Sequence, residues 1–216
     1  MQFDLKAAQL LCSRICHDLI GPAGAVNTGL ELLAEDGTSD DGALALVSDS
    51  ALQVSRRLAF FRVAFGAGGG VGPKAVSESR DLAMSLAGGG KVSVGWDAAA
   101  ARGLDGKVGA EGVKMMLAMI FLAMESMPRG GTVSVSTAAL PEGSAIAITA
   151  AGTGARLHEG VADALNGAAE VDGLTARSII AHFIGCLADR AGVGIEFTEG
   201  RDEVRLAALL PASDAR

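Results

Sequence analysis

The chain has few of the residues that mark extracellular, membrane-spanning or nucleic-acid-binding proteins. Its three cysteines, an odd number, argue against a disulfide framework and fit a reducing compartment. No apolar run approaches the roughly 20 residues that cross a bilayer, and the N-terminus lacks the pattern of a signal peptide. A formal charge of −7 argues against a nucleic-acid surface. We therefore expect a soluble, cytoplasmic protein that binds neither membrane nor nucleic acid.

Aromatic residues are also scarce, at 4% of the chain. Glycine occurs 30 times, yet periodic apolar patterns persist along the sequence. We interpret the composition as a bias of residue usage rather than as low-complexity disorder. With 216 residues and 50% hydrophobic content, the chain can form one large domain or two small ones. Composition by itself therefore indicates a folded protein and leaves its function open.

The first periodic segment carries a histidine that faces water. Apolar residues recur at alternating spacings of four and three, which predicts a long amphipathic helix with a buried seam. This seam consists of Leu11, Ile15, Leu19, Pro22, Val26, Leu30 and Leu33. At about 100° per residue, His17 lies on the side opposite Ile15. A lone exposed histidine is usually a solvated surface residue. Here Asp18 follows it directly and Pro22 follows five residues later, so we treat His17 as a candidate for chemistry.

A second helix follows after a short turn. Residues 36–42 hold the glycine, aspartate and serine residues that end one helix and begin the next. A second seam with heptad spacing runs through Leu44, Val47, Ala51, Val54, Leu58, Phe61 and Phe65. These seams predict an antiparallel helical hairpin. Because two helices leave apolar surface exposed, we expect a homodimer in which two hairpins form a four-helix bundle. The alternative is that the hairpin packs against the rest of its own chain.

A glycine-rich stretch at 66–73 breaks the periodicity and is typical of an interdomain linker. It does not complete a phosphate-binding P-loop, because no Gly-Lys-Ser/Thr follows it. We expect two domains, a helical hairpin over 1–67 and a mixed domain over 74–213. In the second, the patterns predict helices near 77–87, 111–127, 157–165 and 174–190, and strands near 92–96, 132–137, 145–149, 194–198 and 204–210. This mixture predicts an α/β sandwich, a sheet with helices on one face.

Two short motifs resemble those of sensor histidine kinases. Residues 16–22 read CHDLIGP and resemble the H-box, in which an acidic residue follows the phosphorylated histidine and a proline lies five residues after the histidine. Residues 127–133 read MPRGGTV and are similar to the segment after the kinase N-box helix. The hairpin resembles the kinase dimerisation and phosphotransfer domain. The resemblance implies an α+β fold, an N-terminal helical hairpin followed by a histidine-kinase-ATPase-like α/β sandwich.

The nucleotide-binding boxes of those kinases lack their polar residues in this chain. The resemblance aligns the two N-box asparagines with Ala118 and Leu122, which cannot bind Mg²⁺. It aligns the G1 aspartate with Ala150, and the G2 box at 171–176 retains only one glycine. A polar ligand buried without partners costs about 1 to 3 kcal/mol for each unsatisfied group. We therefore do not expect nucleotide binding.

A kinase-like chain that keeps the histidine without an ATP site resembles the alphaproteobacterial histidine phosphotransferases of the ChpT type, and residues 11–18, 21–23 and 62–67 are similar to that family. The resemblance implies that His17 takes a phosphoryl group from a receiver-domain aspartate, holds it as phosphohistidine and passes it to a second receiver. The implied partners are receiver domains of a hybrid histidine kinase and of response regulators. No bound cofactor or metal is expected, because Mg²⁺ comes with the receiver's own acidic pocket.

Two other functions stay open, an ATP-dependent histidine kinase with atypical boxes and a dimeric scaffold in which His17 does no chemistry.

Asp18 resembles the acidic residue that orients the kinase histidine, and the alternative is that it solvates the helix flank. For Arg14, three residues before His17, the options are contact with incoming phosphoryl oxygens or an ion pair with Asp18. Pro22 is expected to bend the helix and to leave a carbonyl near Asp18 free.

Two cysteines share the first helix with the histidine. Cys12 and Cys16 have a spacing that resembles a metal cluster, but the side chains diverge around the helix, so we expect small buried residues at the flank of the seam. Thr28 and Glu31, further along the exposed side, are candidate docking positions for a receiver. His182 lies among apolar residues of the last long helix and is expected to be partly packed.

Overall fold

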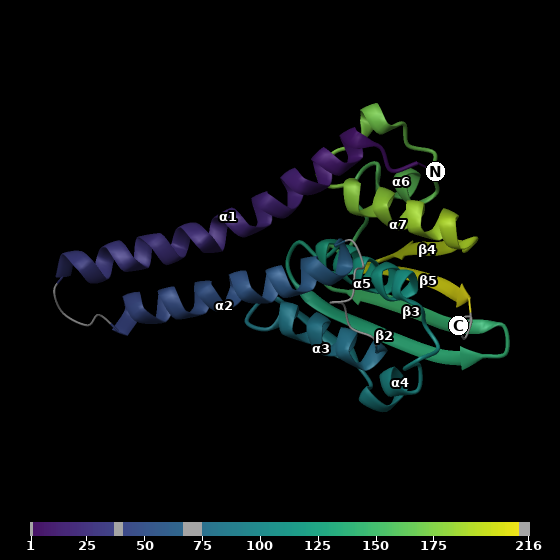
Figure 1. Cartoon of the computed structure of the whole chain (residues 1–216), viewed down its shortest axis with the longest axis horizontal. Coiled ribbons are helices and arrows are strands. Elements are labelled where there is room, and N and C mark those ends of the chain that lie inside the picture. The colour runs from purple at the N-terminus through teal and green to yellow at the C-terminus, as the bar shows by residue number, and fades with distance from the viewer. Residues whose placement is uncertain (1, 37–40, 67–74, 212–216) are drawn as a thin grey trace.

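The computed structural model describes residues 2–36, 41–66 and 75–211. Its N-terminal part is an antiparallel hairpin of two helices, α1 (Leu5–Asp36) and α2 (Asp41–Ala64), which extends well beyond the rest of the chain (Figure 1). Helix α1 begins where the Asp4 carboxylate accepts a hydrogen bond of 2.9 Å from the Ala7 amide. The predicted hairpin is confirmed. Most of the predicted turn at 36–42 and of the linker at 66–73 lies outside the described residues.

The remainder of the chain contains a five-stranded sheet. Its strands are β1 (Val92–Trp96), β2 (Gly131–Leu140), β3 (Gly143–Ala151), β4 (Ile195–Gly200) and β5 (Glu203–Pro211). Their order across the sheet is β1-β2-β3-β5-β4, and the β1–β2 pair is parallel whereas the other pairs are antiparallel. All five predicted strands are present, because each shows the alternation of a half-buried strand.

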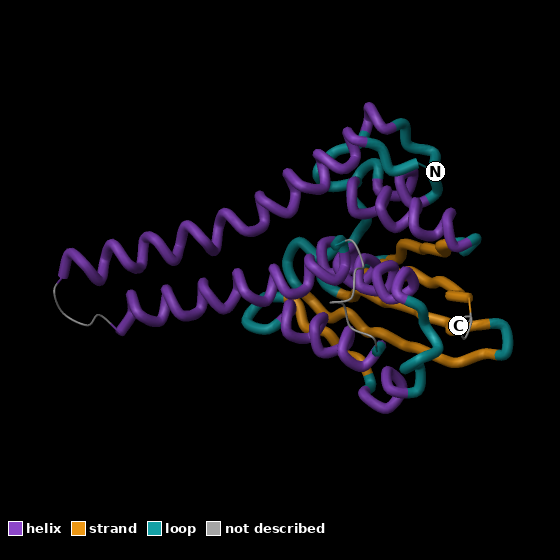
Figure 2. Tube along the Cα trace, viewed as in Figure 1, coloured by secondary structure: helices purple, strands orange, loops and turns teal. Residues whose placement is uncertain are grey.

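Three helices cover one face of this sheet, α3 (Val76–Ala87), α5 (Ala110–Glu125) and α7 (Ile179–Ala191), as Figure 2 shows. Helix α5 lies at the centre of the core, where every residue from 115 to 123 is buried. Such a helix is apolar on all sides because it packs against the sheet and against other helices. The predicted α/β sandwich with helices on one face is therefore confirmed.

The helices beyond β3 differ from the prediction. A short helix, α6 (Val161–Leu165), and a 3₁₀ turn, η1 (Val171–Gly173), precede α7, which begins at Ile179 rather than near 174. The Thr175 amide donates to the Ser178 hydroxyl at 3.0 Å, and such local bonds compete with helical ones. Helix α4 (Ala98–Arg102) was not predicted, because its alanine-rich sequence has no periodicity.

The heptad repeat of α2 places its apolar residues in two columns along the helix, and the two columns differ in burial. Val47, Val54 and Phe61 are buried or half-buried, and Gly29 of α1 lets Val47 approach so closely that a Cβ at position 29 would lie 2.6 Å from its side chain. In contrast, Leu44 and Leu58 are 56% and 50% exposed in the single chain. A single partner helix therefore covers one column and leaves the other exposed, as expected for two helices that form a hairpin.

An aromatic junction joins the base of the hairpin to the sandwich. Six of the seven phenylalanines, Phe3, Phe60, Phe61, Phe65, Phe121 and Phe183, form one connected set of ring contacts. Phe61 of α2 lies 5.5 Å from Phe121 of α5, and Phe65 lies 5.4 Å from Phe183 of α7, measured between ring centroids. The hydrophobic core is therefore continuous from the hairpin into the sandwich. No helix within the described ranges has the length and hydropathy to cross a membrane.

Candidate phosphoacceptor site

His17 projects from the middle of α1 into solvent, with 85% of its side chain exposed. The histidine lies on the face of the helix that the seam leaves free, as its position in the repeat predicts. Asp18 contacts the imidazole on the side of Nδ1. The imidazole is therefore accessible to a macromolecular partner while its backbone is fixed by a continuous helix.

Asp18 is partly buried beside this exposed histidine, with 10% of its side chain exposed. Its Oδ1 lies 3.3 Å from His17 Nδ1, and its Oδ2 accepts a hydrogen bond of 3.0 Å from Arg14 Nε. The Asp18 carboxylate therefore faces two side chains, one at each of its oxygens.

The guanidinium of Arg14 is bound on three sides. In addition to Asp18, it donates through Nη1 to the carbonyl oxygen of Ala176 at 3.1 Å and through Nη2 to the carboxylate of Glu125, the last residue of α5. The pairing of Arg14 with Asp18 is therefore present, and the arginine's donors point at protein acceptors. Glu125 is a residue of this site that sequence reasoning missed, because 111 residues separate it from Arg14.

Pro22 leaves a backbone acceptor free at this same place. A proline has no N–H to donate to the carbonyl four residues before it, which here is the carbonyl of Asp18. Arg57 of α2 donates to that oxygen through Nη1 at 3.0 Å. The expected free carbonyl thus has a partner from the second helix, and Arg57 is another residue that the sequence did not indicate.

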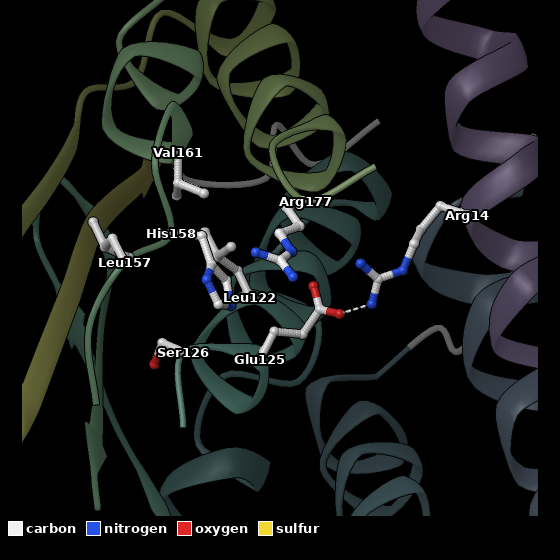
Figure 3. A pocket seen from close by; sticks show the side chains of 8 residues that line it. All are labelled: Arg14, Leu122, Glu125, Ser126, Leu157, His158, Val161 and Arg177. Atoms are coloured by element: carbon white, nitrogen blue, oxygen red, sulfur yellow. Dashed lines mark hydrogen bonds and ion pairs between the residues drawn. The ribbon is translucent and has the colours of Figure 1, made fainter. Parts of the chain in front are cut away.

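A cavity of about 230 Å³ lies on the sandwich side of Arg14 (Figure 3). Its lining consists of Arg14, Leu122, Glu125, Ser126, Leu157, His158, Val161 and Arg177. Burial lowers the pKa of His158, and the cations Arg177, Arg156 and Arg14 lower it further. Ligand pockets usually measure about 300 to 1,000 Å³, so this cavity is small for a nucleotide.

The positions that the resemblance aligns with the nucleotide-binding boxes hold apolar side chains, or backbone amides that donate hydrogen bonds within the protein. Ala118 and Leu122 are buried in the core, as is Ala150. In the glycine loop at 150–154, the Gly154 amide donates to the Asp202 carboxylate at 2.7 Å. The Gly152 amide donates to the Asp202 carbonyl at 3.0 Å. Asp202, in the turn between β4 and β5, therefore accepts hydrogen bonds from two backbone amides of this loop.

The other candidates have mixed outcomes. Cys12 and Cys16 are exposed, so the expectation of buried flank residues is wrong in the single chain, where no second helix covers that side of α1. The described residues contain no cluster of three or more side chains that fits a metal ion. Thr28 and Glu31 are exposed. His182 is buried, stacks on Phe3 with ring centroids 6.0 Å apart and lies 3.6 Å from Cys186 Sγ, so its packing is confirmed.

Comparisons with known proteins show the family of this chain. The sequence profile of the histidine phosphotransferase C-terminal domain matches residues 76–203. The chain is 33% identical to the protein phosphotransferase ChpT of Brucella abortus (strain 2308) over 201 residues, which cover 93% of each chain. The chain belongs to the histidine phosphotransferase family. This histidine phosphotransferase also matches the 1.7 Å structure of a bacterial phosphotransferase with a TM-score of 0.80 and 31% identity, covering 96% of this chain and 98% of the other.

A blue-light activated histidine kinase of Erythrobacter litoralis aligns with this phosphotransferase at a TM-score of 0.45 and 12% identity, covering 93% of this chain and 61% of the kinase. The fold class expected from the sequence, a helical hairpin followed by an α/β sandwich, is confirmed by the order and arrangement of the helices and strands. Membership of the family also gives the protein a role in histidine phosphotransfer.

Proposed function

We propose that this protein is a phosphorelay transferase that receives its phosphoryl group from a partner protein and not from ATP. His17 attacks the phosphorus of a receiver's aspartyl phosphate, the P–O bond to the aspartate breaks, and the aspartate leaves as a carboxylate. A reverse attack by an aspartate of a second receiver then regenerates His17. The observation that carries the proposal is an exposed imidazole on a rigid helix, in contact at Nδ1 with a partly buried carboxylate.

The orientation of the ring assigns a task to each nitrogen. A carboxylate only accepts hydrogen bonds, so the contact with Asp18 favours the tautomer with the proton on Nδ1. Nε2 then carries the lone pair and points away from Asp18, where it can attack phosphorus. Phosphoryl transfer needs positioning and charge neutralisation more than acid and base groups. Mg²⁺ bound in the acidic pocket of the receiver would supply much of that neutralisation.

Independence from ATP is supported by the residues at the aligned nucleotide boxes. The side chains of Ala118, Leu122 and Ala150 offer no atom that binds a metal or an adenine amino group. The proposal places the protein in the cytoplasm, with receiver domains of a hybrid kinase and of response regulators as partners and Thr28 and Glu31 as candidate contacts.

A homodimer is part of this proposal. The exposed column of Leu44, Ala51 and Leu58 repeats every seven residues along α2, and Leu30 of α1 is exposed as well. Exposed apolar residues at heptad spacing are the surface that a second hairpin covers in a four-helix bundle. A continuous stripe of this kind is unusual on a monomer.

Transfer of label from a phosphorylated receiver tests the function directly. We expect label to move from a phosphorylated receiver domain to the wild-type protein and to the matched variant His158→Ala, but not to His17→Ala. Labelling by ATP alone would instead favour a histidine kinase. Labelling by neither source would favour a scaffold. Acid-labile, base-stable label on the wild-type chain would identify phosphohistidine.

A further inference from the structure

Arg14 connects His17 to the sandwich through a rigid set of donors. Its planar guanidinium presents three nitrogens, and each has a different acceptor: Asp18 on its own helix, Glu125 at the end of α5, and the backbone oxygen of Ala176 before α7. A guanidinium bound on three sides has one orientation. That orientation fixes the position of the Asp18 carboxylate.

Glu125 is itself held by the core. It ends α5, in which every residue from 115 to 123 is buried, so the position of its backbone is set by the packing of the sandwich. The side chains of Arg14 and Glu125 are both mostly shielded from water, which strengthens their attraction relative to a surface pair. The packing of the sandwich therefore sets the position of Glu125. Contacts through Arg14 and Asp18 connect Glu125 to His17.

The contact with Glu125 also determines whether Arg14 binds one or both carboxylate oxygens of Asp18. Arginine prefers to bind a carboxylate through two nitrogens at once. Here Nη2 is engaged by Glu125, so Asp18 receives only the Nε donor and keeps Oδ1 for His17. Without Glu125, Nε and Nη2 are both available to Asp18, and the carboxylate can turn Oδ1 away from the histidine.

We infer that Glu125 is a positioning residue for His17, which acts through Arg14 and Asp18 and makes the sandwich part of the phosphoacceptor site. The inference rests on the proposed role of His17 in phosphotransfer. Its first consequence, the position of the His17 proton, exists in the free protein and needs no phosphorylated partner.

The test compares two substitutions at the same position in the full-length protein. Glu125→Leu removes the acceptor, whereas Glu125→Gln keeps an oxygen that can accept from Arg14 Nη2. Glu111→Leu is the matched control, because Glu111 lies on the same helix and pairs with Arg190 at 2.8 Å on the exposed surface. Thermal unfolding of each variant shows whether the fold persists.

The first measurement is the nitrogen NMR shifts of the His17 ring, which report the tautomer. We expect the Nδ1-protonated form to dominate in the wild type, in Glu125→Gln and in Glu111→Leu, and the Nε2-protonated form to increase in Glu125→Leu. The second measurement is phosphoryl transfer from a receiver. We expect Glu125→Leu to slow transfer at saturating receiver about tenfold while the half-saturating receiver concentration stays within about twofold.

An unchanged tautomer and an unchanged transfer rate in a folded Glu125→Leu variant would overturn the inference. A loss in Glu125→Leu that the Glu111→Leu control shares would also overturn it, because a general loss of stability would then be the cause. If the wild type takes no label while the tautomer responds to Glu125, the positioning stands and the proposed phosphotransfer fails.

Discussion

At the scale of single residues, the chain uses histidine in two opposite ways. His17 is exposed and held only at Nδ1, which suits a group that must meet a partner. His182 is buried under Phe3, and burial lowers the pKa of its imidazole. The same side chain is therefore accessible to a partner at one position and packed in the core at the other, and its surroundings make the difference.

The buried histidine makes stability depend on pH. In the unfolded chain His182 titrates near pH 6.5, but in the folded protein its pKa is lowered, so the unfolded state binds more protons below that pH. We expect the free energy of unfolding to fall as pH drops below about 6.5, by at most about 1.4 kcal/mol per pH unit for this residue. Urea unfolding between pH 7.5 and 5.5 measures the slope.

The substitution His182→Gln should reduce this slope. His158 adds to the wild-type slope in the same direction, because its pKa is lowered as well. The carboxylates with lowered pKa, Asp105 and Asp172, act only at lower pH, near and below 3.8. An equal slope in wild type and His182→Gln would contradict the prediction.

Sequence reasoning reached only part of the site at this scale. His17, Asp18 and Arg14 lie within one turn or so of the same helix, so helical geometry alone brings them together. Glu125 and Arg57 come from other elements, and no local pattern indicates a contact across 111 or 39 residues. The exposure of Cys12 and Cys16 likewise depends on which other elements pack against α1. The sequence of α1 alone does not contain this information.

At the scale of elements, the proline inside α1 is accommodated by the neighbouring helix. Arg57 donates to the Asp18 carbonyl that Pro22 leaves without a helical partner. Element boundaries were predicted well where a regular pattern of burial exists, as in the five strands. They were wrong at the start of α7, where side chains of Thr175 and Ser178 bond the backbone locally.

A double-mutant cycle tests the relation between Pro22 and Arg57. Arg57→Met removes the donor, and we expect it to lower the free energy of unfolding by about 1 to 2 kcal/mol because a shielded carbonyl loses its partner. In a Pro22→Ala background an amide at position 22 can donate to that carbonyl, so the same change should cost much less. Urea unfolding of the four proteins measures the coupling.

Arg56→Met provides the control for this cycle. Arg56 also donates to a carbonyl, that of Gly88 at 2.7 Å, but this acceptor is unaffected by Pro22. The effects of Arg56→Met and Pro22→Ala should therefore add. Additive effects of Arg57→Met and Pro22→Ala would show that the arginine does not replace the missing amide.

At the scale of the whole molecule, the exposed column on α2 gives the proposed dimer its test. Leu58 is half exposed in the single chain, so Leu58→Asp should change the fold of one chain little. In a four-helix bundle it would bury two charges and remove two leucines, and we expect dimerisation to weaken at least about a hundredfold. Sedimentation velocity over a range of concentrations measures this.

Leu140→Asp is the matched control, because Leu140 is similarly exposed but lies at the end of β2. This variant should associate like the wild type. A monomeric wild type, or a Leu58→Asp variant that remains as dimeric as the control, would contradict the proposed assembly.

The aromatic junction has a consequence for how a partner reaches His17. Domains move relative to each other when little apolar surface lies between them. Here six phenylalanine rings connect the hairpin to α5 and α7, and exposing each ring to water costs about 1.5 to 3 kcal/mol. A swing of the sandwich over the helix is therefore too costly to be a routine step. The histidine stands on a fixed frame, and the phosphoryl donor must travel to it.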